Sequence, residues 1–213
     1  MPRVADHDAR RRQIADAVIG LIAHSGFDAA TVARVSREAG VSVGLVQHYF
    51  RSKDDLLLFA YRQVVTDINE RVAGCLADGE RARRTISAVV FASMMELLPL
   101  DHRRRGEYRV IRAFLGRSVD NPAMSAIAGE TVRMIHAELA TAVRNGKECG
   151  EVEPAVDESL AALRIAALVD GLAAQYYQEP DRLVGARPLP DAAVELLRFC
   201  LDGIFTGECR HYG

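Results

Sequence analysis

The stretch AGVSVGLVQHYFRSKDDL, residues 39–56, decides how the N-terminal part of this chain folds. Gly40 permits the positive backbone φ that ends one short helix, and Ser42 offers a hydroxyl that caps the next. Ser52 offers a further cap, and Asp55 three residues later completes a variant of the capping box. Two short helices joined by a glycine turn predict a helix-turn-helix.

The residues before this stretch supply the rest of a small helical domain. Gly26 can end a first helix in a left-handed cap, and Thr31 offers the N-cap hydroxyl of a second. Apolar side chains recur at helical spacing in both helices. They are Ile14, Val18, Leu21 and Ile22 in the first, and Val32, Val35 and Ala39 in the second.

The third helix, predicted at about 43–49, has the character of a recognition helix. We expect Leu45 and Tyr49 to be buried on one side. Small or hydrogen-bonding residues occupy the other side, as a helix in a DNA groove requires. They are Val43, Gly44, Gln47 and His48. Spacing alone leaves open a second interpretation, in which this is an αα-corner of a helical bundle and its glycines are merely structural.

The run T-V-x-x-V-S-x-x-A-G-V-S-x-G-x-V-x-x-Y-F-x-S-K-x-x-L-L, from Thr31 to Leu57, resembles the DNA-binding domain of the TetR family of bacterial transcriptional repressors. The resemblance covers about 50 residues, from Ile14 into the helix after Ser52. It implies an all-α protein with a three-helix DNA-binding domain and a larger helical ligand-binding and dimerisation domain. It also implies a repressor that binds a palindromic operator as a homodimer and is released by a small molecule.

Position by position, the resemblance implies two sets of DNA contacts. The phosphate-contact candidates are Thr31, Ser42, Tyr49 and Lys53, and the base-edge candidates are Val43, Gly44, Gln47 and His48. Many members carry a backbone-contacting tyrosine where this chain has Gln47, although some, including the BetI group, have a small or polar residue there. Gln47 can instead contact N6 and N7 of adenine.

Several of the candidate DNA-contact residues also have a structural alternative. The Tyr49 ring can pack in the core with only its hydroxyl reaching DNA, and His48 can be a solvated surface residue. The arginines at 10–12 can form an arm along a phosphate strand or in the minor groove, or can lie in a solvated start. Lys53 begins the next helix, where backbone N–H groups and the helix dipole favour a phosphate.

Composition narrows the class of protein. The 213 residues contain no apolar run of 18, and the start MPRVADHDARRR lacks the apolar segment of a secretory signal. Residues 1–53 carry a net charge of +3 and the remainder −5, as suits a protein whose N-terminal part alone meets a polyanion. The four cysteines are scattered and match no zinc spacing. We therefore expect reduced thiols, a cytoplasmic location, no cofactor and no bound metal.

The rest of the chain predicts a helical body. A long helix starts at Ser52 and runs to about Ala77, where Asp78-Gly79 breaks it. Further helices are expected at about 80–98, 103–116, 122–145, 157–178 and 190–206. The predicted domains are residues 1–52, which bind DNA, and residues 53–213, which bind the effector and dimerise.

The last two helices are the predicted dimer interface. Residues 159–177 are apolar nearly all round, so the helix must be covered on two sides. The final helix presents an apolar face of Val194, Leu197, Leu201 and Ile204. We expect homodimerisation through about 157–178 and 190–206, as the resemblance also implies. The alternative is a core helix buried within a monomer.

An effector site needs an apolar cavity with a few polar groups. The candidates are Met94, His102, Tyr108, Arg112, Phe114, Met134, Asp170 and Tyr176, and beside them Phe91, Met95, His136 and Tyr177. Asp170 interrupts an apolar helix and is expected to be buried, against an arginine or a ligand. The arginines around 103–112 favour an anionic effector or simply form a solvated basic face. The absence of tryptophan gives no support to a choline cage.

Two other classes of protein compete with the regulator. The sequence contains no G-x-S-x-G, Walker A, H-E-x-x-H or G-x-G-x-x-G motif, so an enzyme is disfavoured. Cys209 and His211 resemble a metal or nucleophile pair only superficially. A helical adaptor or small-molecule-binding protein without DNA regulation stays possible on the sequence alone.

Overall fold

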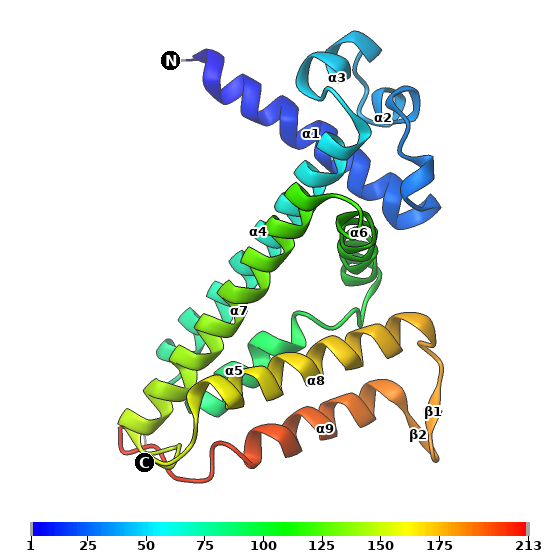
Figure 1. Cartoon of the computed structure of the whole chain (residues 1–213). Helices are drawn as coiled ribbons and strands as arrows, with labels where there is room; N and C mark the ends of the chain where they lie inside the picture. Colours follow the sequence, from blue (N-terminus) through cyan, green and yellow to red (C-terminus); the bar gives the residue numbers. More distant parts are fainter. Residues whose placement is uncertain (1, 212–213) are drawn as a thin grey trace. The chain divides into compact units, whose positions relative to one another are not determined.

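The computed structural model describes the backbone of residues 2–211 and the side chains of residues 9–211. The chain is helical almost throughout, which confirms the all-α prediction (Figure 1). The helices are α1 (Pro2–Ser25), the 3-10 turn η1 (Phe27–Ala29), α2 (Val32–Glu38), α3 (Val43–Tyr49), α4 (Lys53–Arg81), α5 (Ile86–Met95), α6 (His102–Ser118), α7 (Pro122–Cys149), α8 (Glu158–Gln178) and α9 (Leu189–Asp202). Among the described residues, no helix has the length and apolar character needed to cross a bilayer.

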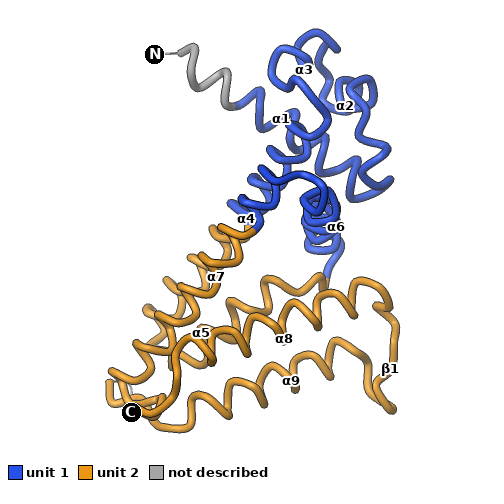
Figure 2. The backbone as a smooth tube through the Cα atoms, in the orientation of Figure 1, with its two compact units in different colours: residues 1–67, 101–128 blue, residues 68–100, 129–213 orange. Residues whose placement is uncertain are grey.

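The chain forms two compact units that do not follow sequence order (Figure 2). Unit 1 contains residues 1–67 and 101–128, and unit 2 contains residues 68–100 and 129–213. Helices α4 and α7 each contribute residues to both units. Unit 1 therefore combines the predicted DNA-binding helices with α6, which lies much later in the chain.

Unit 1 is built around the apolar face predicted for α1. Ile14, Val18 and Ile22 are all at most 1% exposed, and Val35 of α2 and Leu57 of α4 are fully buried. The helical spacing in the sequence thus identified this core correctly.

Helix α6 packs closely against α1 because Gly106 has no side chain. A Cβ atom at Gly106 would lie 2.8 Å from the Cβ of Ala23, closer than real Cβ atoms approach. Arg109, one turn further along, donates from Nη1 to the backbone oxygen of Ala23 at 2.9 Å and satisfies a carbonyl at the end of α1. Tyr61 of α4 stacks on Phe114 of α6 with ring centroids 3.8 Å apart.

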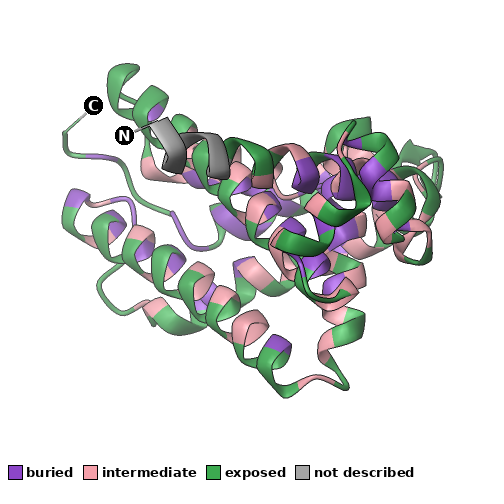
Figure 3. Ribbon diagram, turned by 90° about the horizontal axis from the view of Figure 1, so that it is seen from above, coloured by how far each residue is buried: buried purple, intermediate pink, exposed green. Residues whose placement is uncertain are grey.

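Unit 2 contains the pair α8 and α9, with α5 against α9. Ile165 and Leu197, one from each paired helix, are fully buried. Figure 3 colours the ribbon by burial and shows buried and exposed positions alternating along the helices. Between these helices lies a short antiparallel hairpin that the sequence did not predict, β1 (Leu183–Val184) and β2 (Arg187–Pro188). Gly185 has the positive φ of 64° in its turn.

Two predicted helix breaks are wrong. Gly79 lies inside α4, and Gly146, which follows the helix predicted at about 122–145, lies inside α7, which continues to Cys149. A Cβ atom on Gly79 would overlap Val89 of α5, and one on Gly146 would lie 2.6 Å from Cγ2 of Val152. Each glycine therefore lets its helix pack closely against a side chain from another segment. Helix α5 also begins later than predicted, at Ile86, where the Thr85 hydroxyl accepts from the amide of Ala88 at 3.2 Å.

The contact at Gly106 predicts an asymmetry between two glycines of α6. Replacing Gly106 with alanine overpacks the α1–α6 contact and should lower the free energy of unfolding by about 1–3 kcal/mol. A Cβ atom at Gly116 would meet no neighbour within 4 Å, so Gly116→Ala should raise it by about 0.5–1 kcal/mol through helix propensity. Urea unfolding followed by circular dichroism measures both. Equal effects of the two substitutions would contradict the close contact.

Candidate nucleic-acid interface

Helices α2 and α3 begin at the caps predicted for them. The Thr31 hydroxyl oxygen accepts from the amide of Arg34 at 3.4 Å, and the Ser42 hydroxyl oxygen accepts from the amide of Leu45 at 3.2 Å. Gly40 has a φ of 64°, which confirms the left-handed turn. In both caps the oxygen is the acceptor, so the hydroxyl hydrogen can still donate to a phosphate.

Helix α3 has one buried and one exposed face, but the prediction named the wrong anchors. Val46 is fully buried and Phe50 is 4% exposed, whereas Leu45 and Tyr49 are only half-buried. Val46 lies within α3 and Phe50 is the residue that ends it, so both the helix and its C-terminal end are anchored in the core.

The outward residues of α3 are those that the sequence predicted. Gln47 and His48 are exposed, Val43 is 44% exposed, and Gly44 lies between them on the surface. A Cβ atom at Gly44 would have no neighbour within 4 Å, so packing within this chain does not require a glycine there. The His48 ring meets the Tyr49 ring edge-on, with centroids 5.4 Å apart.

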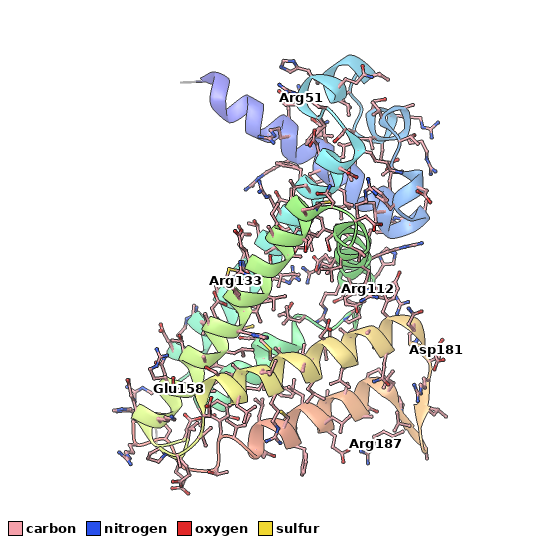
Figure 4. The ribbon with its side chains drawn as sticks, in the orientation of Figure 1. Arg51, Arg112, Arg133, Glu158, Asp181 and Arg187 are labelled. Carbon is pink, nitrogen blue, oxygen red and sulfur yellow. The ribbon has the colours of Figure 1, made fainter. Side chains whose placement is uncertain are left out.

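The start of α4 forms the predicted capping box. The Ser52 hydroxyl accepts from the amide of Asp55 at 3.0 Å, and the Asp55 carboxylate accepts from the amide of Ser52 at 3.1 Å. The same carboxylate oxygen accepts from the amide of Arg51 at 3.0 Å. The Arg51 side chain is exposed beside α3 (Figure 4).

Lys53 is held by two residues of η1 that the sequence did not identify. Its ammonium lies 3.5 Å from the carboxylate of Asp28 and 4.2 Å from the centre of the Phe27 ring. The Lys53 side chain is 37% exposed. The ammonium is therefore positioned beside the start of α4 and still accessible.

The arginines predicted as an arm lie in helix α1. Arg11 is half-buried, with its guanidinium 4.6 Å from the ring centre of Phe59 and 5.9 Å from that of Phe50. Arg10 donates to Gln13 at 2.9 Å. Helix α1 begins at Pro2, so these arginines are part of a helix, and Arg11 packs on aromatic rings. Contact of Arg10 or Arg12 with a phosphate strand stays a prediction.

The effector candidates are divided between the two units. His102, Tyr108, Arg112 and Phe114 belong to unit 1, and Met94, Met134, Asp170 and Tyr176 belong to unit 2. Their burial differs widely. Phe114, Tyr108 and Met94 are buried, Tyr176 is half-buried, and His102, Arg112, Met134 and Asp170 are exposed. The predicted burial of Asp170 is therefore wrong, because that side of α8 is open in this chain.

Most of the arginines around 103–112 have structural partners. Arg103 pairs with Glu107 at 3.4 Å, and Arg104 pairs with Asp101 at 2.7 Å. Arg109 binds the end of α1 as described above. These contacts weaken the case that this basic segment exists to hold an anionic effector, although Arg112 is exposed on α6 (Figure 4).

Comparisons with known proteins agree with this geometry. The family described as bacterial regulatory proteins, tetR family, matches residues 14–59, and the family described as BetI-type transcriptional repressor, C-terminal, matches residues 82–206. The chain belongs to the tetR family of bacterial regulatory proteins. It is a transcriptional regulator of the helix-turn-helix type, so the prediction that it is not an enzyme is confirmed.

Individual relatives match over nearly the whole chain. The transcriptional regulator BetI 2 of Chromohalobacter salexigens is 30% identical over 216 residues, covering 100% of this chain and 95% of that protein. A transcriptional regulator from Rhodococcus sp. Rha1 superimposes with a TM-score of 0.75 at 29% identity, over 92% of this chain and 96% of that one. A Saccharomonospora viridis regulator solved with choline has a TM-score of 0.74 at 23% identity, covering 92% and 95% of the two chains.

The two valines of α3 test which face of the helix meets the core. Val46→Ala removes buried methyl groups and should lower the free energy of unfolding by about 2 kcal/mol. Val43→Ala, on the exposed side, should leave stability within about 0.5 kcal/mol of the parent. Urea denaturation measures both changes. Comparable destabilisation by the two substitutions would show that α3 is oriented differently.

Proposed function

We propose that the chain is a repressor that binds a palindromic operator as a homodimer and places α3 in the major groove. The observation that carries this proposal is the composition of the exposed face of α3. A slim N-terminal end, Val43 and Gly44, is followed by two residues that can hydrogen-bond to bases, Gln47 and His48. Groups able to bind phosphates stand at both ends of this face, as groove-reading helices require.

The phosphate contacts are assigned to four residues that surround the recognition helix. Thr31 and Ser42 donate their hydroxyl hydrogens, Lys53 supplies an ammonium, and Tyr49 supplies its phenolic hydroxyl. The four lie before α2, before α3, at the start of α4 and at the end of α3. Contacts from both sides of the recognition helix set its register on the duplex without reading sequence.

The dimer interface is assigned to the outer faces of α8 and α9. Large apolar side chains are exposed there: Leu160 (65%), Leu163 (49%), Leu196 (46%) and Phe199 (73%). Clustered exposed apolar residues of this kind mark interaction surfaces. The predicted interface residues Leu197 and Leu201 are instead buried within the protomer, at 0% and 1% exposure. The face that they share is the one by which α9 packs on its own chain.

Release by a small molecule is the remaining part of the proposal. We assign DNA binding to residues 1–52 and effector binding and dimerisation to residues 53–213, in the cytoplasm. The BetI-type match over 82–206 and the choline bound to the Saccharomonospora viridis relative support a small-molecule effector. An effector acts only through different affinities for the DNA-fitting and non-fitting states, and the operator must weaken effector binding by the same factor.

DNA binding predicts different effects for substitutions at Gln47 and at Lys53. Gln47→Ala should cost about 1–3 kcal/mol on the operator and little on random DNA, because a bidentate base contact is lost. Lys53→Ala should weaken binding to both DNAs alike and reduce the salt slope by about 1, because one phosphate contact is lost.

Gel-shift and anisotropy titrations would use DNA from upstream of the protein's own gene and a shuffled duplex, at several salt concentrations. Equal loss on both DNAs for Gln47→Ala would assign this residue to the backbone. No binding of the parent protein to either DNA would overturn the proposal and favour a helical adaptor.

The exposed face of α8 and α9 predicts the oligomeric state. The parent protein should sediment as a dimer at micromolar concentration, and Leu163→Glu and Phe199→Glu should each yield monomers, because a charge cannot be buried there unpaired. Val119→Glu is the matched control, since Val119 is 82% exposed outside this face. A monomeric parent, or dimers in both variants, would refute the assigned interface.

A further inference from the structure

Three side chains with metal-binding atoms meet at the C-terminal end of α7. The thiols of Cys149 and Cys209 and a carboxylate oxygen of Glu151 all lie within 4.8 Å of one another. All three residues are buried, with exposures of 6%, 8% and 2%. Their scattered sequence positions gave no such signal, and the expectation of no metal site rested on that spacing.

The backbone holds these residues together from two sides. The amide of Gly207 donates to the oxygen of Glu151 at 3.0 Å, and the amide of Arg210 donates to the oxygen of Cys149 at 2.8 Å. The tail thus runs beside the end of α7, as Figure 1 shows for the red C-terminal segment. Gly150 has a φ of 97°, and a Cβ atom on Gly207 would overlap the oxygen of Gly150. Only glycines at both positions allow this approach.

Glu151 is oriented by the first turn of α5. Its two carboxylate oxygens accept from the amides of Ile86 at 2.8 Å and Ser87 at 3.0 Å. The Cys149 thiol lies 3.5 Å from the first of these oxygens. A carboxylate fixed by outer hydrogen bonds keeps the remaining lone pairs directed at one point, as metal-binding carboxylates do.

An adjoining pocket provides room for a further ligand. This open pocket has a volume of about 350 Å³ and is lined by Glu151 and Cys209 together with Thr85, Ser87, Phe205, Gly207 and Glu208. A three-residue site that opens into such a pocket can take a water molecule in the fourth position of a tetrahedron.

We propose that Cys149, Glu151 and Cys209 bind one thiophilic divalent cation, with Zn²⁺ as the physiological ion. Two thiolates exclude Mg²⁺ and Ca²⁺, which prefer oxygen ligands, whereas two sulfurs and one oxygen suit Zn²⁺. Binding displaces the two thiol protons to solvent, so the two thiolates, the carboxylate and the ion together carry a charge of −1. The ion joins the end of α7 to the C-terminal tail, and Glu151 connects both to the first turn of α5.

The test is a titration of the full-length protein, reduced and freed of metal, with Co²⁺ and then Zn²⁺. We expect one Co²⁺ per chain, the visible bands of tetrahedral cobalt, and sulfur-to-cobalt charge transfer that Zn²⁺ abolishes. Cys209→Ser should lower the charge-transfer absorption by about half. It should weaken Zn²⁺ binding by more than the roughly 10–100-fold that is typical when a residue hydrogen-bonded to a metal ligand is lost, because a ligand itself is removed. Cys75→Ser, at a half-buried thiol outside the cluster, should behave as the parent.

The result can be read even if one variant folds poorly. Cys149→Ser provides a second removal of one thiolate, and circular dichroism of each apo variant establishes that its helices are intact. Folded parent protein that binds no Co²⁺, or that binds it equally well after both cysteine substitutions, would overturn the proposal. So would a Cys149–Cys209 disulfide in protein purified under reducing conditions. None of these readouts involves DNA, so they are independent of the operator-binding tests.

Discussion

The contact between Gly106 of α6 and Ala23 of α1 is the constraint on which unit 1 depends. The two helices approach so closely that a methyl group on Gly106 could not be accommodated, and Arg109 binds the same turn of α1 through the carbonyl of Ala23. Interdigitated contacts of this kind do not deform gradually, because packed interfaces have few intermediate arrangements. A displacement of α6 must therefore move α1 with it. In the effector release proposed above, this contact would carry a change in α6 to the helices assigned to DNA.

The parts of the fold that the sequence predicted correctly are those determined by neighbours along the chain. Thr31, Ser42 and Ser52 cap the helices predicted for them, and Gly40 adopts the left-handed conformation. These interactions span three or four residues, so their spacing is visible without a structure. Helix α3 was bounded correctly for the same reason.

The errors arise where distant residues decide the outcome. Gly79 and Gly146 were predicted to end helices, but each makes room for a side chain from another element. Leu197 and Phe199 are both large apolar residues of α9, yet only the folded protomer shows that Leu197 is buried and Phe199 is exposed. The cluster of Cys149 and Cys209 was missed because the two residues lie 60 positions apart. Apolar pattern and ligand spacing do not encode such contacts.

The environment of Lys53 explains how the phosphate contact proposed for it can be both prepared and weak. Phe27 and Asp28 restrict a side chain that otherwise has four rotatable bonds, so less conformational entropy is lost when DNA arrives. The pair with Asp28 is exposed on both sides, and such pairs contribute only about 0–1 kcal/mol. A phosphate can therefore replace the carboxylate at small cost, while Asp28 stays nearby and repels the same phosphate. The net gain from the proposed contact is therefore modest, and the proposal leaves discrimination between DNA sequences to the exposed face of α3.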